Sequence, residues 1–129
     1  MPGSLGVWLA VAGGGALGAL ARFAVSRWTN AHLGGTLPFG TLLVNVLGSF
    51  LLGALATVFR ERYELRPEVQ LLLTTGFMGA FTTFSTFSLE TWTLALEGAW
   101  GRAGLNLLAN LFLSLLACGL GIWWFRVAP

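Results

Sequence analysis

A stripe of polar and small side chains interrupts an otherwise apolar run over residues 38–59. Thr41, Asn45, Ser49 and Gly53 recur at every fourth position, which places them on one face of a helix. The amide and the hydroxyls are uncharged hydrogen-bond donors, and such donors bind an anion weakly enough to release it again. Asn45 is therefore a candidate for either a pore ligand or a contact between helices.

Two phenylalanines lie in a segment rich in hydroxyl side chains, Thr-Thr-Phe-Ser-Thr-Phe-Ser at residues 82–88. Phe84 and Phe87 are three positions apart and therefore share a helical face. Aromatic rings carry a positive edge, which can coordinate an anion without a full charge. The spacing by itself favours ordinary packing in the core. Ser85 and Thr86 flank the rings and offer hydroxyls to the ion or to the neighbouring backbone.

The segment that contains these rings, roughly residues 69–97, is too long for one straight membrane span. Gly76 and Gly79 interrupt it just before the hydroxyl-rich stretch. Irregular backbone inside a membrane is tolerated only where protein buries it or where it lines a wet cavity. We therefore predict a broken helix with its break near residues 79–83. Carbonyls at such a break can bind a cation, and a glycine kink without an ion is the alternative.

The composition indicates that lipid surrounds these elements. Of the 129 residues, 56% are hydrophobic and only 9% are charged, and the mean hydropathy is +0.79. Soluble domains carry about 25% charged residues. A spanning helix needs about 20 apolar residues, and four such spans fill the chain. We expect one all-α transmembrane domain over residues 1–129, with spans at about 5–28, 38–59, 69–97 and 103–125.

The remaining polar and small residues allow several interpretations. Gly14 and Gly18 form a GxxxG pair in the first span, where small residues let helix backbones approach each other. Asn106, Asn110 and Ser114 form a second polar stripe in the last span.

Arg22 and Glu90 are each a candidate for a pore-mouth or a structural role. No group of His, Cys, Asp and Glu suggests an enzyme or a metal cluster, and the scattered arginines do not form a nucleic-acid-binding face. The single cysteine, Cys118, is interpreted as a small core residue.

The arginines give almost no preference for one orientation in the membrane. With four spans, the termini and the middle loop share one side. Four arginines lie on that side and three on the other, namely Arg60, Arg62, Arg66 and Arg126 against Arg22, Arg27 and Arg102. The positive-inside rule then gives little bias. One explanation is a chain that inserts both ways and forms an inverted homodimer, the two-chain counterpart of inverted repeats. The alternative is an orientation fixed by features that this count misses.

Three segments in order carry a resemblance to a known family. They are GGALGALARF at residues 14–23, PFGTLLVNVLGSF at residues 38–50 and GFMGAFTTFSTFSLE at residues 76–90. Together they resemble the Fluc fluoride channel family, also called CrcB proteins, and the likeness covers nearly the whole chain. Met78 stands where many members of that family have cysteine.

The resemblance implies a dual-topology homodimer in the cell inner membrane, with two antiparallel pores that export fluoride passively from the cytoplasm. It also implies a structural sodium ion at the dimer interface, held by the carbonyls of Gly79 and Thr82 from both subunits. By the same resemblance Phe84 and Phe87 form the aromatic pair of the pore, and Ser114 belongs to a polar track on the fourth helix.

Two other functions fit part of the pattern. A small four-span multidrug-type exporter has a similar length, but its proton coupling needs a membrane carboxylate in the first helix. No acidic residue precedes Glu61, which argues against that function. A structural or accessory subunit is the second alternative, although such a protein needs no aligned polar stripes.

Overall fold

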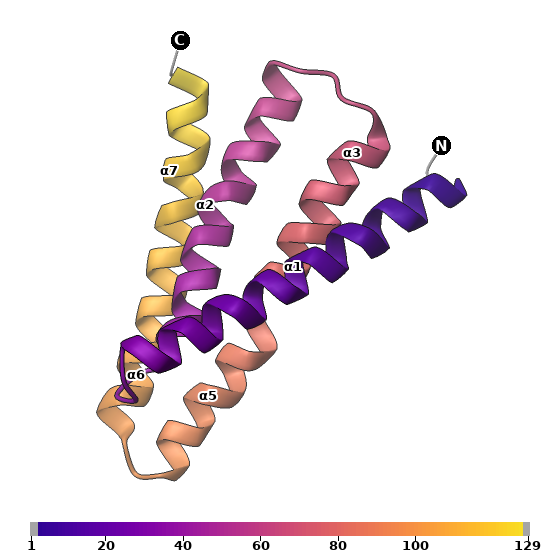
Figure 1. The fold of residues 1–129 in the computed structure, drawn as a ribbon. Helices are drawn as coiled ribbons and strands as arrows, with labels where there is room; N and C mark the ends of the chain where they lie inside the picture. The colour runs from indigo at the N-terminus through magenta and orange to yellow at the C-terminus, as the bar shows by residue number, and fades with distance from the viewer. Residues whose placement is uncertain (1–2, 128–129) are drawn as a thin grey trace.

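The computed structural model describes residues 3–127, which form helices joined by short turns. Figure 1 shows the helices as an elongated bundle. In chain order the elements are α1 (Leu5–His32), α2 (Phe39–Glu61), α3 (Pro67–Leu71), η1 (Leu72–Met78), α4 (Gly79–Phe81), α5 (Phe84–Leu96), α6 (Trp100–Leu108), η2 (Ala109–Leu113) and α7 (Ser114–Val127). The elements η1 and η2 are stretches of wider π-helical turns. They continue directly into their neighbours, so α3, η1 and α4 form one helix, and α6, η2 and α7 form another.

Three continuous helices are long and apolar enough to cross a membrane, namely Leu5–His32, Phe39–Glu61 and Trp100–Val127. They agree with three of the predicted spans. A helix of 28 residues is about 42 Å long, whereas the hydrocarbon core is about 30 Å thick. Such a helix must tilt, and Figure 1 shows α1 lying across the bundle at an angle to α2 and α7.

The third segment breaks at Thr82 and Thr83, inside the range that the sequence predicted. Both residues have extended backbone, with ψ angles of 159° and 118° respectively. The helical piece before the break covers residues 67–81, and α5 follows it with 13 residues. Figure 1 shows the two pieces following one another along the height of the molecule. The break therefore lies at mid-height in the bundle.

Direct backbone contact holds α1 against the first piece of this segment. A Cβ atom added to Gly14 would overlap the carbonyl oxygen of Leu72, and one added to Gly18 would overlap that of Phe77. From the other side, a Cβ atom on Gly76 would lie 2.9 Å from the carbonyl oxygen of Val11. The predicted close approach at the GxxxG pair is therefore confirmed, and its partner is η1.

The helices α2 and α7 approach each other in the same way. A Cβ atom on Gly53 would overlap the Cys118 carbonyl, and one on Gly121 would overlap the Phe50 carbonyl. This contact brings the polar stripe of α2 to face the stripe on the last helix. Because both stripes turn toward the break between α4 and α5, the candidate site forms at their meeting point.

Candidate functional site at the helix break

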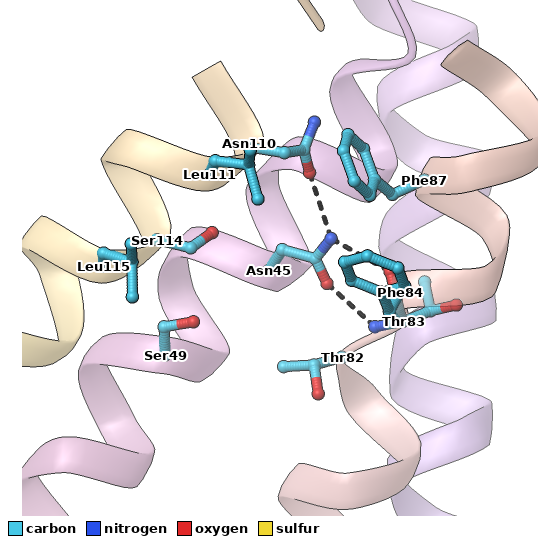
Figure 2. Close-up of a pocket in the computed structure, with 10 residues that line it drawn as sticks. All are labelled: Asn45, Ser49, Thr82, Thr83, Phe84, Phe87, Asn110, Leu111, Ser114 and Leu115. Atoms are coloured by element: carbon cyan, nitrogen blue, oxygen red, sulfur yellow. Dashed lines mark hydrogen bonds between the residues drawn. The ribbon is translucent and has the colours of Figure 1, made fainter. Parts of the chain in front are cut away.

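The side chain of Asn45 forms hydrogen bonds with the backbone at the break. Its Nδ2 donates to the carbonyl oxygen of Thr83 at 3.0 Å, and its Oδ1 accepts from the Thr83 backbone N–H at 2.8 Å. Nδ2 also donates to Oδ1 of Asn110 at 3.0 Å, as Figure 2 shows. In a continuous helix the Thr83 N–H would instead donate to the carbonyl of Gly79. The amide on α2 therefore takes the place of the missing helical partner.

The break leaves several carbonyls without their usual donors, among them those of Gly79 and Thr82. The Thr83 N–H turns to Asn45, and the Thr86 N–H donates to Oγ1 of Thr83 at 3.1 Å. Within residues 3–127 the carbonyls of Gly79 and Thr82 accept no hydrogen bond. They lie at the end of the helical piece 67–81, where the helix dipole concentrates partial negative charge. Because carbonyl oxygens there favour a cation, these two groups suit the predicted sodium ion.

A cavity of about 290 Å³ lies beside the break, between α2, α5 and the last helix. Figure 2 shows its walls. Ten residues line it, and none of them is charged: Asn45, Ser49, Thr82, Thr83, Phe84, Phe87, Asn110, Leu111, Ser114 and Leu115. The structure thus brings Asn45, both predicted rings and Ser114 to one cavity from three separate parts of the sequence.

The two rings differ in how the fold holds them. Phe84 and Phe87 meet edge to face, with ring centroids 5.3 Å apart and planes at 70°. Phe87 is 4% exposed, whereas Phe84 is 71% exposed. Phe87 is therefore part of the packing and of the cavity wall, so a substitution there changes both. Phe84 is the ring whose removal disturbs the fold least.

The hydroxyl of Ser114 is a donor in this cavity that has no hydrogen-bond partner among the described residues. Its Oγ is buried and makes no hydrogen bond among the described residues. Both hydrogens of the Asn45 amide, by contrast, are already engaged. A buried polar group without a partner costs about 1–3 kcal/mol. An acceptor that enters the cavity therefore finds an unpaired donor at Ser114.

Ser85 and Thr86 do not line this cavity. Ser85 is exposed, and its Oγ lies 3.4 Å from Oγ1 of Thr83. Oγ1 of Thr86 accepts a hydrogen bond from the Thr83 hydroxyl at 3.0 Å. Each step along a helix turns the side chain by about 100°, so neighbours of the rings in sequence point elsewhere. The two hydroxyls lie at the break without joining the rings.

Thr86 and Arg22 meet in a second cavity, of about 370 Å³, on another side of the break. Thr41 and Thr83 also line it. Thr83 is common to both cavities, so the break separates the uncharged cavity from one that contains a guanidinium group. The structure therefore places Arg22 close to the break but outside the cavity that holds the rings.

Glu90 lies on α5 and contacts the polar stripe of α2. Its Oε1 accepts a hydrogen bond from the Thr41 hydroxyl at 2.8 Å. Its Oε2 is buried and has no partner among the described residues. Glu90 also borders a cavity of about 330 Å³ beneath the turn that contains Gly34 and Gly35. This position suits either of the roles predicted for Glu90.

From the sequence, Asn106 and Asn110 are members of a polar stripe with no predicted role in the site. In the structure Asn110 is 4% exposed, lines the uncharged cavity and accepts a hydrogen bond from Asn45. The regular spacing with Ser114 was the signal that could have identified it. Thr91, which accepts a hydrogen bond from Asn106, carried no such signal.

Comparison with known proteins agrees with this architecture. Residues 9–122 match the family model described as CrcB-like protein, Camphor Resistance (CrcB). A protein of Syntrophotalea carbinolica named fluoride-specific ion channel FluC is 50% identical over 87% of this chain and 91% of its own length. A protein of the same name from Saccharophagus degradans is 51% identical over 88% and 85% of the two chains. One from Roseiflexus is 41% identical over 94% and 98%. The chain therefore belongs to the CrcB family of multi-pass membrane proteins.

Proposed function

We propose that this protein is a channel that lets fluoride leave the cytoplasm passively through the cell inner membrane. The observation that carries the proposal is the uncharged cavity at the helix break, where a free hydroxyl, an amide and two aromatic rings converge. The names of the relatives, fluoride-specific ion channel, support the choice of ion. No observation favours the exporter, since no acidic residue precedes Glu61.

Fluoride is a small anion that binds water strongly, so a pore must replace its water with other donors. Ser114 supplies an unpaired hydroxyl, and the rings of Phe84 and Phe87 supply positive edges. Asn45 holds the break and exchanges its bond to Asn110 for the passing ion. No lysine or arginine lines this cavity, so the ion is released as readily as it binds.

The fourth membrane crossing in this proposal is the broken segment. The pieces on either side of Thr82 and Thr83 follow one another along the bundle, and the C-terminus lies at the same end as the loop between α2 and α3 (Figure 1). The turns after α1 and α5 lie at the other end. With four arginines on one side of the membrane and three on the other, Arg22 near the break included, the chain inserts in both orientations and forms an antiparallel homodimer with two antiparallel pores.

A sodium ion at the dimer interface completes the proposed assembly. The carbonyls of Gly79 and Thr82 are its ligands from each copy, because the break leaves both without a donor. Gly79 is exposed on the surface of the single chain, as a residue at an interface between two copies must be. The ion would neutralise the negative ends of two helices and so stabilise the dimer.

The central test is fluoride efflux from liposomes that contain only this purified protein. The wild type should carry fluoride and exclude chloride. Phe84→Ile keeps apolar bulk but removes the ring edge, and Ser114→Ala removes the unpaired hydroxyl. Each should slow fluoride efflux about tenfold or more, as expected for a barrier raised by 1.36 kcal/mol or more.

The control is Leu113→Ala, which alters an exposed residue of the same helix that does not line the cavity. It should carry fluoride at the wild-type rate. Gel filtration should show the same dimer for all variants. Wild-type efflux in both Phe84→Ile and Ser114→Ala would show that the cavity is not the pathway, and a wild type without fluoride efflux would exclude the channel function itself.

A further inference from the structure

A one-way chain of hydrogen bonds leads from the helix break to a part of the protein that does not touch the uncharged cavity. Asn45 donates to Asn110, and Nδ2 of Asn110 donates to Oδ1 of Asn106 at 3.1 Å. Nδ2 of Asn106 donates to Oγ1 of Thr91 at 2.9 Å, and that hydroxyl donates to the carbonyl of Phe87 at 2.8 Å. The chain connects α2, the last helix and α5.

The direction of these bonds is fixed by groups that can act in only one way. The Thr83 N–H can only donate, so Oδ1 of Asn45 must face it. The Phe87 carbonyl can only accept, so the single hydrogen of the Thr91 hydroxyl points there. The backbone carbonyl of Asn106 also accepts from Nδ2 of Asn110, at 3.0 Å, which fixes the middle of the chain. All three amides therefore have one orientation only.

Because these amides are buried, water cannot replace the hydrogen bonds that an amide loses when it is rotated by 180°. Asn106 is 2% exposed and Asn110 is 4% exposed. If Asn106 turned over, its oxygen would face the Thr91 oxygen and its NH2 group would face that of Asn110. Buried groups that lose their partners are destabilised. The amide of Asn106 therefore depends on the hydroxyl of Thr91, and its Oδ1 is one of the two acceptors of the Asn110 NH2 group.

Two members of this chain, Asn106 and Thr91, do not reach the proposed path of the ion. Thr91 and Asn106 are absent from the walls of the 290 Å³ cavity. Thr91 instead borders a separate groove of about 230 Å³ beside Trp92 and Trp100. Thr91 can therefore affect fluoride only through its partners, the Asn106 amide and the carbonyl of Phe87.

We propose that Thr91 and Asn106 are positioning residues of the pore: Thr91 orients the Asn106 amide, and Asn106 holds the side chain of Asn110 against Asn45, without either of them touching the ion. The proposal rests on the fluoride pathway proposed above. When the Thr91 hydroxyl is absent, the NH2 group of Asn106 has no acceptor. The Asn106 amide then loses its single orientation, Asn110 keeps only the backbone acceptor of its NH2 group, and the cavity wall and the break become less ordered.

The test compares substitutions that differ in one hydroxyl group. Thr91→Val keeps the shape of the side chain and removes the hydroxyl, whereas Thr91→Ser keeps the hydroxyl. Thr91→Val should carry fluoride roughly tenfold more slowly than the wild type, and Thr91→Ser should remain near the wild-type rate. If Thr91→Val does not fold, Thr91→Ala compared with Thr91→Ser gives the same contrast.

The matched control is Thr93→Val. The Thr93 hydroxyl also donates to a carbonyl of its own helix, that of Leu89, at 2.8 Å, but no amide donates to it among the described residues. Its removal should leave the rate near that of the wild type. A slow Thr93→Val, or a Thr91→Val at the wild-type rate, would overturn the proposal.

A double variant separates positioning from a general loss of structure. If Thr91 acts through Asn110, then Thr91→Val combined with Asn110→Ala should be no slower than Asn110→Ala alone. Slowing by the product of the two single effects would show that Thr91 acts independently of Asn110. The proposed role of the hydrogen-bond chain would then be wrong.

Amide hydrogen exchange tests the proposed role of the hydrogen-bond chain even if the protein does not conduct fluoride. The Thr83 N–H should exchange faster in Thr91→Val than in the wild type or in Thr93→Val. Equal exchange in all three proteins would contradict the proposed role of the hydrogen-bond chain. A wild type without fluoride flux would contradict only the proposed function.

Discussion

At the scale of single residues, Asn45 shows how one side chain stabilises a backbone break inside a membrane. Water cannot satisfy free peptide groups there, so each must find a partner in the protein. A primary amide carries a donor and an acceptor side by side and can pair with both groups of a peptide. Asn45 pairs with the N–H and the carbonyl of Thr83 in this way. The extended backbone at Thr83 is stable because an amide faces it.

Two substitutions of Asn45 separate the effect of its hydrogen bonds from the effect of its size. Asn45→Asp keeps the shape but places an oxygen opposite two acceptors, the Thr83 carbonyl and Oδ1 of Asn110. Asn45→Ala removes the side chain and repels nothing. We expect Asn45→Asp to lower both the fluoride rate and the melting temperature more than Asn45→Ala does. Each buried group left unpaired costs about 1–3 kcal/mol.

Thermal unfolding in detergent and fluoride efflux from liposomes are the two measurements for this pair. A variant Asn45→Asp that is as stable and as fast as Asn45→Ala would contradict the bonds assigned to the amide.

At the scale of the elements, contact between backbones holds the broken segment in place. The glycine face of α1 touches the carbonyls of η1 directly, so that no side chain lies between the two helices. Lipid offers no hydrophobic driving force between helices, and close packing is what stabilises their association. The position of the break thus depends on small residues far away in the sequence.

Two neighbouring glycines of α1 give a matched pair for this contact. Gly18→Ala should lower stability by about 1–3 kcal/mol, because the added methyl group overlaps the Phe77 carbonyl. Gly13→Ala meets nothing within 4 Å and should change stability by less than about 0.5 kcal/mol. Denaturation in mixed micelles measures both. Equal stability of the two variants would show that α1 and η1 do not pack as described.

At the scale of the whole molecule, the near balance of arginines at the two ends is the basis for the proposed inverted pair. Exposed apolar side chains along the helices, such as Trp8 at 68% and Leu115 at 70%, provide the surface that meets lipid or a second copy. Neither end of the bundle carries enough excess positive charge to fix the orientation.

Added charge should therefore separate the two orientations. Gly35→Arg with Thr36→Arg adds two positive charges at one end, and Tyr63→Arg with Leu65→Arg adds two at the other. All four positions are exposed. Each double variant should insert in one orientation and be inactive alone, because an antiparallel partner is missing. Co-expression of the two should restore fluoride resistance in a fluoride-sensitive host, and full activity of either one alone would exclude the antiparallel dimer.

Removal of sodium tests the proposed sodium site at the carbonyls of Gly79 and Thr82. A dimer purified and refolded in sodium should melt at a higher temperature than one prepared in N-methylglucamine, because the ion neutralises carbonyls that otherwise face each other. Potassium, which is larger, should restore less stability. Identical melting curves in all three solutions would argue against a structural sodium ion at Gly79 and Thr82.

The sequence by itself determined three of the membrane spans and the place of the break. Lipid requires that nearly every peptide group be paired within the chain, so long apolar runs must be helical, and the predicted spans agree with α1, α2 and the last helix. The glycines and hydroxyls at residues 76–88 mark the break because they suit neither lipid nor a regular helix. These conclusions need only composition and local periodicity.

Only the tertiary structure decided which groups meet at the break. The sequence placed Asn45 and Ser114 on polar faces, but it could not show that Asn45 pairs with Thr83, nor that Thr86 turns away from the rings toward Arg22. Those partners depend on how α2 packs on α7 and how α1 packs on η1. A shift of one residue in either contact would turn a side chain by about 100°, so the site exists only once the helices are packed.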